Sequence, residues 1–219
     1  MTDAYRPKSR RPIAQPLRRT ATTAVALCCR LNVHPDLISY LSVVASLIAA
    51  VCFWYSARWP WLLLVAPLFC YARLYCNMLD GMVALASGKA SRRGELLNEL
   101  PDRVSDLLVF VSIAHSGLAH MLLGYWAGIA AVLTAYVGTL GQAAGAHRDY
   151  SGLMSKPWRM VVVHAGAWAT FFMPQVSVEL WRGATLSLMD VACVIIILGC
   201  VQTMIQRLVR IVRALSQGT

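Results

Sequence analysis

Half of the acidic residues of this chain lie in one stretch, from residue 77 to residue 106. The sequence holds ten Asp and Glu residues, and five of them fall in "NMLDGMVALASGKASRRGELLNELPDRVSD". Apolar runs flank this stretch on both sides, so carboxylates here are costly unless they are paired, hydrated or bound to cations. The five acids are Asp80, Glu95, Glu99, Asp102 and Asp106.

The spacing of the acids predicts two helix faces that meet. Two sets of positions recur at intervals of three and four, which puts each set on one face of a helix: 77, 80, 81 and 84, and 95, 98, 99, 102 and 106. A short turn at "SGKASRRG" joins the two helices, so the faces can meet at one depth. Carboxylates that face each other repel unless a cation lies between them. Because the cluster offers only oxygen ligands, the cation it favours is Mg²⁺ or Mn²⁺ and not Zn²⁺.

A glycine directly follows the first acid. Gly81 has no side chain, so a bulky ligand can approach the backbone next to Asp80 closely. A metal-bound phosphate group fits such a place. The alternative for Asp80 is a helix-packing ion pair with Arg73, seven residues earlier on nearly the same face. The spacing of the surrounding residues favours the ligand role.

The elements that must position these residues are membrane helices. Hydrophobic residues make up 58% of the chain and charged residues 14%, whereas soluble domains carry about a quarter charged residues. No Asp, Glu, Lys or Arg occurs from Leu37 to Ala57. We therefore predict an all-α integral membrane protein with six transmembrane helices in one bundle. The predicted helices cover 37–57, 60–87, 94–116, 119–142, 157–178 and 185–207.

The first 34 residues form a separate basic segment in this prediction, and residues 35–219 form the six-helix membrane domain. Between Pro16 and Val33, apolar residues recur every three or four positions with basic and polar residues between them. This pattern predicts an amphipathic helix that lies in the membrane interface and precedes the bundle. The first twenty residues lack the apolar core of a secretion signal, so we expect no cleavable signal peptide.

The basic residues predict the orientation in the membrane. They gather in the N-terminal segment, two loops and the C-terminus, which puts both termini and the acid cluster on the cytoplasmic side. The net charge of +10 indicates contact with anionic lipid headgroups. Nucleic-acid binding is not expected, because the charge is divided among four membrane-side segments. The basic residues of the four predicted cytoplasmic segments are Arg6, Lys8, Arg10, Arg11, Arg18, Arg19, Arg30, Lys89, Arg92, Arg93, Arg148, Lys156, Arg159, Arg207, Arg210 and Arg213.

The acidic stretch resembles the signature of the CDP-alcohol phosphatidyltransferase family, which reads DxxDGxxAR, then eight residues, then GxxxDxxxD. The spacing agrees across the whole signature, and "NVHPDLISYLSVVASLIAA" is similar to the family's first membrane helix. Three signature positions differ, with Asn77 for the first acid, Leu85 for the arginine and Asn98 for the third acid. Five positions match, namely Asp80, Gly81, Ala84, Gly94 and Asp102.

The resemblance implies a reaction and its partners. The family transfers a phosphatidyl or other substituted phosphate group from a CDP-linked donor to a hydroxyl group and releases CMP. For this chain it implies CDP-diacylglycerol and a small alcohol as substrates, Mg²⁺ or Mn²⁺ as cofactor, the bacterial inner membrane as location and pairing as a homodimer. The family holds two divalent ions between its first, second and fourth acids and uses the third acid as a base.

Carried over to this sequence, the resemblance gives Asn77, Asp80 and Asp102 as metal ligands, with Asp106 as a further ligand. Asn98 cannot accept a proton, so the adjacent Glu99 is the favoured base, and Glu95 and Asp106 are the alternatives. The predicted substrate contacts are Gly81, Ala84, Gly94, Arg92, Arg93, Lys156 and Arg159.

Each basic residue near the site also has a simpler interpretation. Arg92 and Arg93 can contact lipid headgroups, and Lys156 and Arg159, in "SGLMSKPWRM", can mark topology. Arg103 can neutralise Asp106 or Glu99.

Two functions from different classes remain open. The first is the enzyme, with an acceptor that can be glycerol 3-phosphate, inositol phosphate, serine, glycerol or another alcohol. The second is a catalytically silent relative that binds nucleotide-lipid or metal as a regulatory or assembly partner, which Asn77 and Asn98 permit. An ion or proton transporter is disfavoured, because it would not require Gly81 and Gly94.

Overall fold

The structure is a computed structural model that describes residues 15–89, 92–147, 149–179 and 185–216. For residues 15–20, 92, 93 and 95–98 it describes the backbone but not the side chains. Within these ranges the chain forms seven α-helices and one β-hairpin. The helices are α1 (Gln15–Arg30), α2 (Pro35–Trp54), α3 (Leu62–Ala86), α4 (Arg92–Ala114), α5 (Met121–Ala143), α6 (Lys156–Phe172) and α7 (Leu188–Ser216), and the strands are β1 (Ser177–Glu179) and β2 (Thr185–Ser187).

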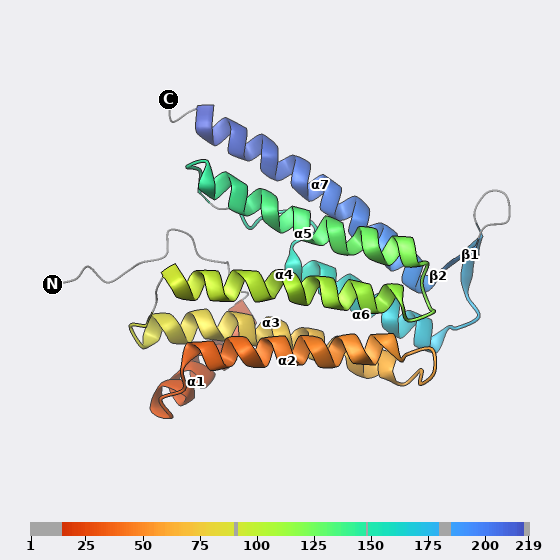
Figure 1. The fold of residues 1–219 in the computed structure, drawn as a ribbon, viewed down its shortest axis with the longest axis horizontal. Coiled ribbons are helices and arrows are strands. Elements are labelled where there is room, and N and C mark those ends of the chain that lie inside the picture. The colour runs from red at the N-terminus through yellow and green to blue at the C-terminus, as the bar shows by residue number, and fades with distance from the viewer. Residues whose placement is uncertain (1–14, 90–91, 148, 180–184, 217–219) are drawn as a thin grey trace.

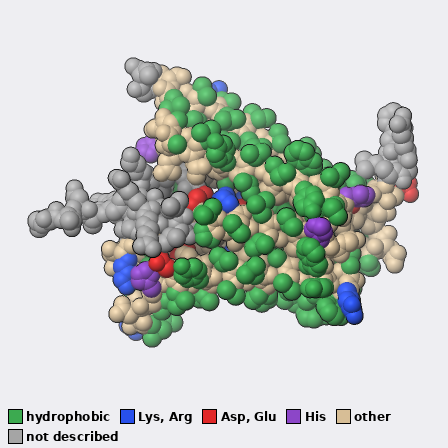
Figure 2. Space-filling model, in the orientation of Figure 1, with side chains coloured by type: hydrophobic (Ala, Val, Ile, Leu, Met, Phe, Trp, Pro, Cys, Tyr) green, Lys and Arg blue, Asp and Glu red, His purple; other side chains and the backbone are tan. Residues whose placement is uncertain are grey.

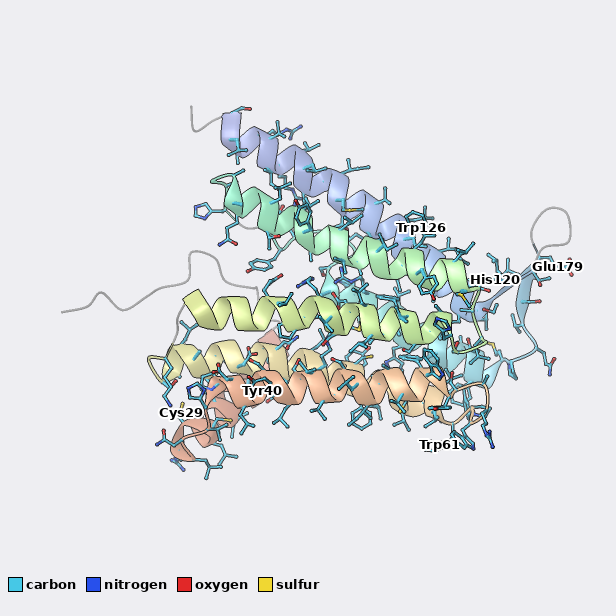
Figure 3. The ribbon with its side chains drawn as sticks, in the orientation of Figure 1. Cys29, Tyr40, Trp61, His120, Trp126 and Glu179 are labelled. Atoms are coloured by element: carbon cyan, nitrogen blue, oxygen red, sulfur yellow. The ribbon has the colours of Figure 1, made fainter. Side chains whose placement is uncertain are left out.

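The helices pack around a shared core. Helix α2 packs against α3 and α4, α5 packs against α4 and α7, and α6 packs against α3 and α7 (Figure 1). The N-terminal ends of α2 and α4 and the C-terminal end of α3 lie at the end of the molecule where α1 lies. We call this the α1 end, and the opposite end, which carries β1 and β2, the hairpin end. Figure 3 shows Cys29 at the α1 end and Trp61, His120 and Glu179 at the hairpin end.

The prediction of a mostly helical membrane fold is confirmed. Within the described residues, α2, α3, α5 and α7 are long and apolar enough to cross a membrane. Hydrophobic side chains cover most of the face seen in Figure 2. Helix α4 carries the charged residues of the acidic stretch, and α6 has only 17 residues. Membrane crossing by α4 and α6, and so the count of six spans, stays a prediction.

The chain departs from the predicted helix limits at the hairpin end. The helix predicted at 157–178 ends at Phe172, because Pro174 follows and a residue before proline disfavours the helical conformation. Strands β1 and β2 then pair antiparallel, which the sequence analysis did not predict. Helix α7 begins at Leu188, where Ser187 Oγ accepts from the Asp190 N–H at 3.0 Å and the Asp190 carboxylate accepts from the Ser187 N–H at 3.0 Å. It continues to Ser216, past the predicted end at 207.

Helix α1 lies close to its predicted position. Its partly buried residues Ala24, Val25 and Cys28 pack against a small apolar cluster that α2 and α3 form with Ile38 and Val83. The apolar side of α1 is therefore used in part for packing against the bundle. Its place in the membrane interface stays a prediction.

The loop that precedes α6 is fixed to α7. The Met154 N–H donates to Thr203 Oγ1 at 2.9 Å, and Arg207 Nε donates to the Ser151 carbonyl oxygen at 2.9 Å. Because these contacts hold the residues just before α6, they also fix where the first turn of α6 enters the bundle.

Candidate active site

The buried guanidinium of Arg73, on α3, connects two carboxylates of α4. Its Nη2 atom lies 2.7 Å from Asp106 Oδ1 and 3.3 Å from Asp102 Oδ1, and it donates to the Asp102 carbonyl oxygen at 2.9 Å. The side chains of all three residues are inaccessible to solvent. A buried charge needs such partners, because an unpaired charge in a membrane protein is strongly destabilising.

Helix α6 adds two cations to the same place. The Lys156 ammonium donates a hydrogen bond to Asp102 Oδ1, and Arg159 Nη2 lies 3.2 Å from Asp106 Oδ2. Lys156 and Arg159, two of the predicted substrate contacts, are thus brought to the acids of α4. Their contact with substrate stays a prediction.

Arg103 contacts three carboxylates of its own helix. Its Nη2 atom lies 2.9 Å from Glu99 Oε1 and 3.2 Å from Asp102 Oδ2, and its Nη1 atom lies 3.5 Å from Asp106 Oδ2. These pairs agree with the simpler interpretation of Arg103. We call the whole set the ion cluster, which consists of Arg73, Glu99, Asp102, Arg103, Asp106, Lys156 and Arg159.

The predicted meeting of the two helix faces occurs at Asn77 and Asp102. Asn77 Nδ2 donates to Asp102 Oδ1, and Asn77 Oδ1 accepts from Ser42 Oγ at 2.5 Å. One turn further along α3, Asp80 Oδ2 accepts from Ser39 Oγ at 2.6 Å. Asn77, Asp80 and Asp102 are all buried. Helix α2 therefore holds the side chains of Asn77 and Asp80.

Sequence reasoning missed Ser39 and Ser42. They lie three positions apart in the uncharged run 37–57, and this spacing was the available signal, because it puts both hydroxyls on one helix face. Arg73 was considered only as a partner for Asp80, whereas the structure pairs it with the acids of α4.

The space beside Gly81 is open. Among the described residues, and apart from the adjacent backbone of its own helix, an added Cβ at Gly81 would meet no atom within 4 Å, and Gly81 is exposed although the adjacent Asp80 is buried. Ala84 follows on the same helix and is half-buried, and Gly94 lies near the start of α4. The predicted site residues whose side chains lie outside the described part of the structure are Arg92, Arg93, Glu95 and Asn98.

The oxygen donors fit a divalent ion that is bound together with a phosphate ligand. Within the described ranges, no three His, Cys, Asp or Glu side chains form a group that could hold a metal ion by themselves. Asp80 supplies a hard carboxylate oxygen from α3, whereas Asp102 of α4 already accepts from the Asn77 amide. Magnesium is often held by only one or two carboxylates, and substrate phosphates and water supply its other ligands.

Several buried guanidinium nitrogens lack a hydrogen-bond partner among the described residues. They are Arg73 Nε, Arg73 Nη1, Arg103 Nε and Arg159 Nε. Buried donors are nearly always paired, and guanidinium groups suit phosphate oxygens. The ion cluster therefore has donors to spare for an anionic ligand.

Comparison with known proteins finds relatives that cover most of this chain. It is 29% identical over 147 residues to inner membrane protein YnbA of Escherichia coli (strain K12), and the aligned region covers 66% of this chain and 71% of YnbA. It is 26% identical over 210 residues to phosphatidylinositol phosphate synthase of Streptomyces avermitilis, and the aligned region covers 91% of this chain and 81% of that protein. The chain is thus similar to members of the CDP-alcohol phosphatidyltransferase family. No family model matches it.

A solved structure has the same fold as this chain. Phosphatidylinositol phosphate synthase of Mycobacterium tuberculosis with CDP-DAG bound superposes with a TM-score of 0.66 at 24% identity, over 88% of this chain and 94% of that chain. The same protein in complex with manganese and citrate also gives a TM-score of 0.66. The resemblance drawn from the acidic stretch is thus confirmed at the level of family and fold.

Proposed function

We propose that this CDP-alcohol phosphatidyltransferase transfers a phosphatidyl group from CDP-diacylglycerol to a small alcohol and releases CMP, with Mg²⁺ or Mn²⁺. One observation carries the proposal: buried guanidinium donors without partners among the described residues lie in the ion cluster that contains Asp102. Such a site suits the phosphates of a nucleotide-lipid. The relatives support the proposal, because one has been solved with CDP-DAG and with manganese.

The proposed reaction is one displacement at phosphorus. The acceptor hydroxyl oxygen bonds to the phosphorus that carries diacylglycerol, and the bond from that phosphorus to the bridging pyrophosphate oxygen breaks. CMP leaves with the electron pair, and a carboxylate takes the hydroxyl proton. A divalent ion held by the motif carboxylate Asp80 would polarise the pyrophosphate and neutralise the leaving group.

Glu99 is the base in this proposal. Its side chain is 22% exposed, whereas those of Asp102 and Asp106 are inaccessible and engaged by several cations. A carboxylate with some access to solvent can receive and pass on a proton more readily than one enclosed by arginines. Arg103, 2.9 Å away, orients Glu99.

The two cations of α6 favour a phosphorylated acceptor. Lys156 and Arg159 come from a different helix than Asp80 and Asn77, so an anionic acceptor can contact α6 while the donor contacts α3 and α4. The relatives named phosphatidylinositol phosphate synthases support inositol phosphate as the first acceptor to test.

We further propose that the site and both termini face the cytoplasm at the inner membrane. Asp80 and Gly81 lie toward the C-terminal end of α3, which is at the α1 end, and α1 and the C-terminal end of α7 lie on the same side in Figure 1. The relative from Escherichia coli is named an inner membrane protein. Pairing as a homodimer stays a prediction of the resemblance.

The test is CMP release from CDP-diacylglycerol by the purified protein with Mg²⁺ or Mn²⁺. Inositol phosphate, glycerol 3-phosphate, serine and glycerol are supplied in turn, and the lipid product is identified by mass. We expect release with a phosphorylated acceptor. If folded protein binds CDP-diacylglycerol but releases no CMP with any acceptor, the silent binding relative becomes the better description.

A further inference from the structure

The carboxylate of Asp102 is enclosed by donors from three helices. Its Oδ1 atom accepts from the Asn77 amide, from Lys156 and from Arg73 at 3.3 Å, and its Oδ2 atom accepts from Arg103 at 3.2 Å. An ionised carboxylate offers about four lone-pair positions. Four donors therefore leave Asp102 little capacity for a divalent ion.

Asn77 turns its nitrogen toward Asp102. The Ser42 hydroxyl holds the Asn77 carbonyl oxygen at 2.5 Å, so the amide N–H is the atom that points at Asp102 Oδ1. A metal ion between the two side chains would need the oxygen there, because an amide N–H repels a cation. The geometry thus disfavours a shared ion between Asn77 and Asp102.

Arg73 already supplies positive charge at this place. Its side chain is inaccessible to solvent and is held by Asp106 at 2.7 Å, and its Nε and Nη1 atoms have no hydrogen-bond partner among the described residues. These N–H groups can donate to phosphate oxygens. The asparagines at 77 and 98 also remove two negative charges from the family signature, which equals the charge of one divalent ion.

We infer that this protein uses one divalent ion, with Asp80 as its main carboxylate ligand, and that Arg73 takes the role of the second ion beside Asp102. The inference rests on the proposed function, because both cations would contact the donor pyrophosphate. Arg73 is then a donor-binding residue, and Asn77 keeps Asp102 oriented toward it. Asp80 differs from Asp102 in that it lies next to the open space at Gly81.

The test counts bound Mn²⁺ by the loss of the free Mn²⁺ signal in electron paramagnetic resonance, on the detergent-purified chain with saturating CDP-diacylglycerol. We expect one Mn²⁺ per wild-type chain. The double variant Arg73→Gln with Asn77→Asp removes the fixed cation and restores the first acid, so it should bind a second ion. Gln at 73 keeps a donor for Asp106, which helps the variant to fold.

A matched control carries the same charge change away from the site. Asn32→Asp with Arg210→Gln alters two exposed residues and should leave the count at one. The inference would be overturned if the wild-type chain bound two Mn²⁺ ions or none. It would also be overturned if the folded double variant still bound only one Mn²⁺ ion. One bound ion without CMP release would contradict the proposed function alone, and two bound ions with CMP release would contradict the inference alone.

Discussion

Nη2 of Arg73 lies 2.7 Å from Oδ1 of Asp106, although the two residues belong to different helices and both side chains are inaccessible to solvent. This contact joins α3 to α4 at the depth where the signature residues lie. Arg159 approaches the other oxygen of Asp106 at 3.2 Å from α6. Asp106 therefore links three helices through charge, and the ion cluster serves as a structural element as well as a candidate site.

Arg73→Met should destabilise the protein strongly. It removes one partner of a buried pair and leaves carboxylates uncompensated, which typically costs about 3–5 kcal/mol. In a chain of this size the midpoint of thermal unfolding in detergent should fall by roughly 10 °C. Arg210→Met is the control, because Arg210 is 53% exposed and pairs with Asp149 at the surface. Equal midpoints for the two variants would contradict the structural role of Arg73.

Ser42→Ala should lower the free energy of unfolding by about 1–3 kcal/mol, because the buried carbonyl of Asn77 loses its donor. The control is Ser46→Ala, on the same helix and equally buried. Among the described residues, its hydroxyl donates only to the Ser42 carbonyl oxygen, one turn earlier in the helix. Chemical unfolding of both variants measures the difference. A loss for Ser46→Ala as large as that for Ser42→Ala would argue against a special contact at Asn77.

Gly81→Leu should abolish CMP release without loss of stability. In the part of the chain that the structure describes, no atom outside the adjacent helix backbone lies within 4 Å of an added Cβ, and replacing glycine in a helix favours folding by up to about 1 kcal/mol. The added side chain would instead fill the space proposed for the donor. Ala86→Leu, at an exposed position near the end of the same helix, should keep wild-type activity. Full activity in a folded Gly81→Leu variant would show that no ligand approaches this glycine.

Lys156→Met should separate metal binding from acceptor binding. Removing the ammonium group from Asp102 removes a repulsive charge near the metal, so Mn²⁺ should bind about tenfold more tightly. The KM for a phosphorylated acceptor should rise, because one of its proposed cations is gone. Lys89→Met, on an exposed loop residue, should change neither quantity. Weaker Mn²⁺ binding in Lys156→Met would be the opposite of the expected result.

The sequence predicted which helices form the site better than it predicted the contacts between their side chains. Spacings of three and four placed Asn77 and Asp102 on facing helices, because helical periodicity is a local property, and the structure confirms their contact. The partners of Arg73 were not predictable, since a long side chain reaches residues that only tertiary packing brings near. Ser42 was missed because a serine in an apolar helix gives almost no hydropathy signal.

The same distinction applies to the fold. The long apolar helices followed from composition, whereas β1 and β2 have three residues each, too few for a periodic pattern. The approach of Lys156 and Arg159 to the acids depends on how the loop before α6 is held by Thr203 and Arg207 of α7. Those contacts join residues about fifty positions apart, which no local pattern encodes.

The most direct test of the central claim is the initial rate of CMP release from CDP-diacylglycerol, with Mg²⁺ and inositol phosphate, by wild type and by Asp80→Asn. We expect the variant to be at least about a hundredfold slower, because a metal-binding carboxylate supports several kcal/mol of transition-state stabilisation. Asp36→Asn, an exposed carboxylate in the first turn of α2, should match wild type. Equal rates for wild type and Asp80→Asn, or release that persists in a metal chelator, would contradict the account.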